Sequence, residues 1–129
     1  MSHEAYFRKF RIFREEALKD IEIGAYNKAV SALWFSVEAL LRGLLLKMGK
    51  NPPERSGKLI NISMGILFQD VENATHLSRL LTSLHYQRRE VDHRKRIADK
   101  TYAEISLKKY NEVISIITKK YPWIKRLLT

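Results

Sequence analysis

Apolar residues along the chain follow the spacing of amphipathic helices, and no segment keeps the two-residue alternation of a β-strand. In the first segment, about His3–Ile23, they recur mostly every three or four positions and so define one helical face. Ser2 is a candidate N-cap, although Ala5 stands where a capping box needs Glu or Gln. Gly24 marks the end of this helix. Its predicted inner residues are Tyr6, Phe10, Phe13, Ala17, Leu18 and Ile21.

The second segment, about Ala25–Met48, is the most apolar, which predicts a central helix with several neighbours. Gly49 and the following Asn51-Pro52-Pro53 end it. Glu38 and Arg42 interrupt its apolar run, so the pattern favours a buried core helix over a membrane span. Its predicted core stripe is Ala29, Leu33, Val37, Leu40, Leu41, Leu44 and Leu45, widened by Trp34 and Leu46.

Three further helices are expected. A short one covers about Leu59–Leu67, and long ones cover about Ala74–Val91 and Ala103–Tyr121. The connections are a polar loop at Lys50–Gly57, a turn at Phe68–Asn73 with Asn73 as a cap, and a basic stretch at Arg94–Lys100. Pro122 should kink or end the last helix. The predicted inner residues of the two long helices are Leu77, Leu80, Leu81, Leu84, Val91, Ile105, Tyr110, Val113, Ile114 and Ile117.

Together these segments predict an all-α fold, an antiparallel up-and-down bundle of four long helices plus one short helix. The 129 residues fit a single domain, residues 1–129, and 45% of them are hydrophobic, which suffices for a core. The absence of Cys excludes disulfides and thiolate metal sites and fits a reducing cytoplasm. No signal-peptide pattern opens the chain, so we expect a cytoplasmic protein without a membrane partner.

The formal net charge of +10 changes this picture in one of two ways. A Lys/Arg-rich surface attracts a polyanion such as RNA or DNA. The same surface can also serve only to keep the protein solvated.

Arg88 stands out in the helix predicted over Ala74–Val91. It follows Leu77 by eleven residues, which returns it to almost the same angular position and places it inside the apolar stripe. A buried unpaired charge is costly, and Asp92, one turn on, is the obvious partner. The residues leave two interpretations open. Arg88 either pairs with Asp92 at the bundle end while reaching water, or it lies in a crevice and binds a phosphate with two hydrogen bonds.

His93 is the candidate general acid or base, because histidine titrates near neutral pH. It points about 140° away from Arg88 on an ideal helix. The two converge only if the helix ends or distorts near Asp92, or if two subunits share the site. Otherwise His93 is an ordinary surface residue.

Basic residues cluster around this motif and are candidates for nucleic-acid binding: Arg89, Arg94, Lys95, Arg96 and Lys100. Tyr86 and Tyr102 flank them and could stack on bases. The alternative is a solvated basic turn with core-packing tyrosines. No histidine spacing typical of a metal site is present, and no glycine-rich phosphate loop or dinucleotide motif occurs, so we predict no metal and no cofactor.

Several segments resemble the HEPN domain family. Gly24–Val30 and Val37–Gly49 are similar to its second helix, Pro52–Leu59 to its proline-containing approach to the third, and Arg88–His93 to its Arg, four to six residues, His motif. The resemblance runs from about Glu4 to Ile117.

The resemblance implies a homodimer that often functions with RNA. In ribonuclease members, Arg and His from both subunits form a metal-independent site where the ribose 2′-hydroxyl attacks the adjacent phosphate. Arg88 would then stabilise phosphate charge, and His93 would move protons. The sequence departs from the family pattern at Arg89, where active ribonucleases often carry Asn, Asp or His. It departs again at Lys95, where toxins regulated by a nucleotidyltransferase often carry Tyr.

Three functions therefore stay open. The first is an RNA-binding protein that acts as an endoribonuclease. The second is a non-catalytic helical module that binds a nucleotide or a nucleotidyltransferase partner. The third is a structural dimer whose basic surface gives solubility.

Overall fold

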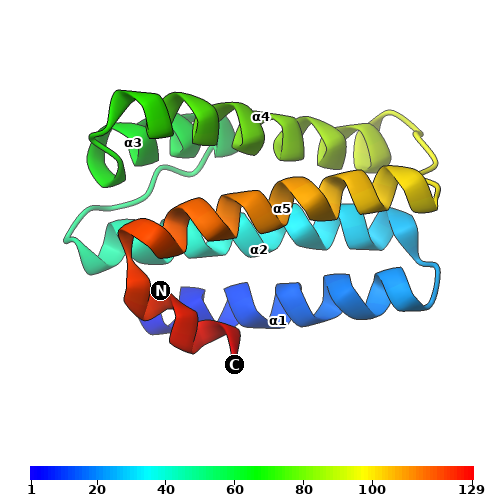
Figure 1. The fold of residues 1–129 in the computed structure, drawn as a ribbon, viewed down its shortest axis with the longest axis horizontal. Coiled ribbons are helices and arrows are strands. Elements are labelled where there is room, and N and C mark those ends of the chain that lie inside the picture. Colours follow the sequence, from blue (N-terminus) through cyan, green and yellow to red (C-terminus); the bar gives the residue numbers. More distant parts are fainter.

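The computed structural model describes all 129 residues, except for the side chain of Val71. The described backbone forms six helices and no strand (Figure 1). In chain order they are α1 (His3–Glu22), α2 (Tyr26–Lys47), α3 (Ser56–Leu67), α4 (Val71–His93), α5 (Lys100–Lys120) and a final 3₁₀ helix, η1 (Pro122–Leu128). The predicted all-α fold is confirmed.

The four long helices run alternately in opposite directions, as in an up-and-down bundle (Figure 1). The central helix is α2, which packs against α1, α3, α4 and α5. The α1–α2 turn and the α4–α5 turn lie at the same end of the bundle, whereas α3 and η1 lie toward the other end (Figure 1). This arrangement places the predicted basic stretch beside the start of α2.

Local signals account for most of the helix boundaries. The Ser2 hydroxyl accepts a hydrogen bond from the Ala5 amide at 3.2 Å, which confirms the first N-cap. Gly24 and Gly49 follow α1 and α2 with φ of 80° and 78°, backbone conformations that favour glycine. The prediction that Asn73 caps α4 was wrong. Asp70 is the cap and accepts from the Glu72 amide at 3.2 Å, so α4 begins three residues earlier than expected.

The core contains the whole predicted stripe of α2, except that Leu46 is only partly buried. The prediction that Leu18 and Ile105 face inward was wrong, since Leu18 is 40% exposed and Ile105 is 46% exposed. Phe7, which the prediction omitted, is buried instead. Its ring lies 5.6 Å from the ring of Trp123 in η1, so the returning C-terminal segment covers this part of α1.

Within the described residues, α2 is the one helix long and apolar enough to span a membrane by those two criteria. In the bundle, 72% of its most apolar window is buried against other helices. That burial is what the predicted core helix requires.

Candidate functional site at the C-terminal end of α4

Arg88 lies on the α2-facing side of α4, next to Asp92, which Ser31 of α2 also contacts. Its Nε is 3.0 Å from Oδ2 of Asp92, and the Ser31 hydroxyl donates a 2.6 Å hydrogen bond to Oδ1 of the same carboxylate. The Arg88 Nε–H group is buried and does not point squarely at the oxygen, so the contact is an ion pair rather than a hydrogen bond. The predicted Arg88–Asp92 pair is therefore present.

The Arg88–Asp92 pair is only partly exposed to solvent. The Arg88 side chain is 23% exposed and the Asp92 side chain 30%, and the Arg88 guanidinium carbon lies 5.0 Å from the centre of the Phe35 ring. An aromatic face next to a cation adds a favourable interaction and limits its hydration. Arg88 is thus held by two direct contacts, one from α4 and one from α2, and keeps some access to solvent.

His93 is the last residue of α4 and is exposed. The helix ends only after it, at Arg94, whose amide donates to the carbonyl of Glu90 at 3.3 Å. Because the backbone stays helical from Arg88 through His93, the two side chains diverge by about 140°. Within one chain Arg88 and His93 therefore do not converge, and His93 is either an ordinary surface residue or part of a site shared between two subunits.

The turn after α4 has a fixed shape. The amide of Arg96 donates to the Glu90 carbonyl at 3.0 Å, and Lys95 between them has a φ of 58°. A lysine in this left-handed conformation is uncommon, because a Cβ there crowds the backbone. The side chain of Lys95 is exposed.

A second group of side chains gathers on the other side of α4, around Glu90. A hydrogen bond to Glu90 is the main cause that raises the pKa of Tyr86, and the positive charges of Arg94 and Arg96 oppose it. The guanidinium of Arg96 lies 4.6 Å from the ring centre of Tyr102. This group is distinct from the Arg88 pair, since Glu90 points roughly 160° away from Arg88 on the helix.

The structure therefore brings the predicted site residues together in part. Arg94 and Arg96 share the Glu90 group, and Arg88 belongs to the Asp92 pair. Arg89 and Lys100 are exposed, and Lys100 lies 3.8 Å from the carboxylate of Glu104. Among the described side chains, no group of three or more His, Asp or Glu residues is placed to hold a metal ion.

His85, one turn before Arg88, packs its ring 4.9 Å from that of the buried Trp34. Burial lowers the pKa of His85, and the positive charges of Arg89 and Arg88 lower it further. Its imidazole therefore favours the neutral form next to the Arg88 pair.

Sequence reasoning missed the contributions of α2 to the site. Ser31 and Phe35 are one turn apart on α2, and both reach the Arg88 pair from another helix. The sequence signal that could have indicated this contribution is the hydroxyl of Ser31, at the partly exposed edge of the apolar helix α2. Its partner, however, depends on how α2 packs against α4.

A bundle of this topology, with an Arg and a His one to two turns apart at the end of its fourth helix, defines an all-α protein with a candidate anion site. The model of the HEPN domain family matches residues 3–121, nearly the whole chain, and the chain belongs to that family. No curated protein and no solved structure matches the chain in the comparisons made.

Proposed function

We propose that this protein is a cytoplasmic homodimer that binds RNA and cleaves it without a metal ion. The two copies together supply Arg88 and His93 to the site. The observation that supports this is the fixed position of Arg88, a partly exposed guanidinium held by Asp92 and Phe35. A preorganised guanidinium suits a phosphate because it stabilises charge without rearranging as the reaction proceeds.

The proposed reaction needs one proton acceptor and one proton donor. The imidazole of His93 takes the proton of the ribose 2′-hydroxyl as that oxygen attacks the adjacent phosphorus. The bond from phosphorus to the 5′-oxygen then breaks, and this oxygen receives a proton from an imidazolium or from water. Arg88 faces the phosphate oxygens as their negative charge rises. The products are a 2′,3′-cyclic phosphate and a 5′-hydroxyl.

The basic groups on the opposite side of α4 have a different role in this proposal. Arg94 and Arg96 bind backbone phosphates, and Tyr86, which is 57% exposed, offers a ring to a base. Arg89 adds a further exposed charge on α4. These contacts hold RNA by charge and stacking and do not require a particular sequence.

One observation favours a second function, a non-catalytic module that binds a nucleotide or a nucleotidyltransferase partner. Asp92 already occupies the guanidinium of Arg88, so a phosphate has to compete with a carboxylate 3.0 Å away. A site that only binds tolerates this competition better than one that must stabilise a transition state.

The deciding experiment incubates mixed RNA with the purified protein in EDTA. The unmodified protein and the control His76→Ala should cleave, whereas His93→Ala should not. His76 is a matched control because it is an exposed histidine on the same helix, 3.1 Å from Glu112 and away from the Arg88 pair. The products are examined for cyclic phosphate ends.

Cleavage that survives His93→Ala would refute the assignment of the proton-transfer group. If the unmodified protein cleaves no RNA but binds a nucleotide or a nucleotidyltransferase, the non-catalytic module is the function.

A further inference from the structure

The turn between α4 and α5 is held by a side chain from the start of α2. The amide nitrogen of Asn27 donates to the Arg96 carbonyl at 3.4 Å, and the amide oxygen of Asn27 accepts from the Ala98 N–H at 2.6 Å. These two hydrogen bonds flank Ile97, whose side chain is 84% exposed. Ala98 is buried against Val30, Val91 and Ala103, which anchors the same turn from below. The outward position of Ile97 is thus built into the fold.

Lys95 projects from the same turn. Its left-handed backbone conformation and its exposed side chain place a charge two residues before Ile97. No hydrogen bond or ion pair to the Lys95 side chain occurs within the described residues. We call Lys95 and Ile97 the docking turn. It presents one cation and one large aliphatic group on a rigid support.

A groove of about 580 Å³ lies beside this turn, between α1 and α2. Phe13, Ala32 and Phe35 give it an apolar floor, and the two phenyl rings are 5.5 Å apart. Two carboxylates of α1, Glu16 and Asp20, line it as well, and neither forms an ion pair among the residues described. Further polar lining comes from Lys28 and Ser31 of α2 and Asp92 of α4, so the groove adjoins the Arg88 pair and its carboxylates outnumber its one lysine. Asn27 lines the groove and also holds the docking turn, so the two features are neighbours on one surface.

The turn and the groove have complementary chemistry. An aliphatic side chain suits an apolar floor, and a lysine suits carboxylates, which are uncommon in a chain of net charge +10. We propose that the α1–α2 groove of one copy receives the docking turn of a second copy, and that the second groove receives the first turn in the same way. This inference rests on the homodimer of the proposed function and names its interface.

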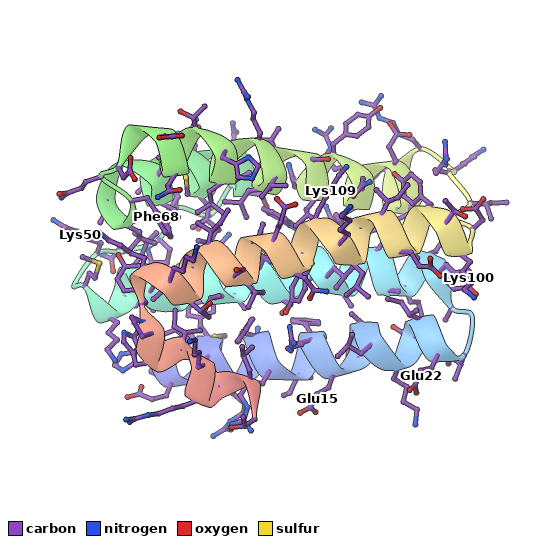
Figure 2. All side chains as sticks on the ribbon, viewed as in Figure 1. Glu15, Glu22, Lys50, Phe68, Lys100 and Lys109 are labelled. Carbon is purple, nitrogen blue, oxygen red and sulfur yellow. The ribbon has the colours of Figure 1, made fainter. Side chains whose placement is uncertain are left out.

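Because the docking turn and the groove are neighbours on one surface, they favour a closed two-fold dimer over an open chain of subunits. In a two-fold dimer the same surface patch serves on both subunits, so a turn and a groove on one patch can engage reciprocally. The arrangement also brings together the ends of the two α4 helices, which carry Arg88 and His93. Both turns of this end of the bundle are visible in Figure 2, near the labels of Glu22 and Lys100.

Other occupants fit less well. A phosphate backbone gains little from an isoleucine, and a lipid surface does not need a turn fixed by two hydrogen bonds. A complementary protein surface does reward such rigidity, because less conformational freedom is lost on binding. Arg94 and Arg96 lie with the Glu90 group and stay available for RNA in this dimer.

The test is the dimer dissociation constant, measured by analytical ultracentrifugation on the full chain. Ile97→Asp should weaken the dimer by about tenfold or more, because a carboxylate would enter an apolar, acidic groove. Ile105→Asp is the matched control, since Ile105 is an exposed isoleucine on α5 outside the groove. Both side chains are on the surface, and circular dichroism verifies that both variants fold.

A charge exchange provides the second arm. Lys95→Glu and Asp20→Lys should each weaken the dimer, and the double variant should restore most of the affinity. A dimer that is insensitive to Ile97→Asp, or a double variant no better than the singles, overturns this interface and leaves the RNA function standing. If the wild-type protein is still a monomer at about 100 μM, far above a dissociation constant in the micromolar range, both this interface and the homodimer of the proposed function are overturned.

Discussion

The substitution Asp92→Asn tests the ion pair that positions Arg88. It removes the charge that faces Arg88 while an oxygen remains to accept the Ser31 hydroxyl. Exposed ion pairs contribute up to about 1 kcal/mol to the free energy of unfolding, whereas breaking a fully buried pair costs about 3–5 kcal/mol. Since the two side chains are 23% and 30% exposed, this pair lies between those cases. We expect a loss of about 1–2 kcal/mol, or a fall in Tm of about 3–8 °C.

The assay is urea unfolding at neutral pH, with Glu104→Gln as the matched control. Glu104 also pairs with a basic residue one turn away on a helix, but its contact with Lys100 is 3.8 Å and the side chains are 55% and 72% exposed. Its loss should cost less than about 0.5 kcal/mol. Combining Asp92→Asn with Arg88→Gln in a double-mutant cycle should give a coupling energy of about 1 kcal/mol. If Asp92→Asn costs no more than Glu104→Gln, the pair does not hold Arg88 in place.

The same variant separates binding from catalysis. Without the competing carboxylate, Arg88 is freer to meet a phosphate, so RNA affinity should rise. Cleavage at saturating RNA should fall, because the guanidinium is no longer positioned. If the RNA affinity and the cleavage rate at saturating RNA changed by the same factor in the same direction, this would count against a positioning role for Asp92.

Three further predictions follow from other parts of the structure. RNA affinity, measured by fluorescence anisotropy, should fall steeply with salt. Alanine at both Arg94 and Arg96, with Lys95 of the docking turn left unchanged, should flatten that slope by about 0.7 per lost phosphate contact; an unchanged slope would place RNA elsewhere. The pKa of His85 is below its usual value of 6.5, so the folded state binds fewer protons than the unfolded state below that pH. The stability that comes from keeping His85 neutral is present above pH 6.5 and declines as pH falls toward the folded-state pKa. Urea unfolding should therefore show a smaller loss of unfolding free energy between pH 7 and pH 5 for His85→Gln than for the unmodified protein. Gly43→Ala should lose about 1–2 kcal/mol in a thermal melt despite the helix propensity of alanine, because its Cβ would lie 2.5 Å from Cε1 of Phe7. An unchanged Tm would mean that the Phe7 ring moves aside freely.

Features that depend on nearby residues were predictable from the sequence. The apolar stripe of α2 follows from helical spacing, and the Arg88–Asp92 pair follows from a separation of one turn. The Ser2 cap was likewise identified, because its hydrogen bond spans three residues. In each case the interacting groups belong to one helix, whose geometry is known before the fold is.

Features that depend on packing between helices were not predictable. Leu18 and Ile105 continue the spacing of their stripes, yet they lie at the stripe edges where no neighbouring helix covers them. Phe7 is buried because Gly43 leaves room for its ring and Trp123 lies beside it. Asn27 gave no signal, since its two hydrogen bonds reach a turn about 70 positions away in the chain.

The central position of α2 has a consequence for how the protein opens in solution. This helix packs against four other elements, and most of its residues are buried. No neighbour can leave the bundle without exposing part of it, and α2 itself cannot leave while the others stay. Backbone amides in the middle of α2 should therefore exchange their hydrogens only when the entire chain unfolds, whereas η1 and the ends of α3 exchange through smaller openings. The slowest amides of this helix should thus report the global free energy of unfolding.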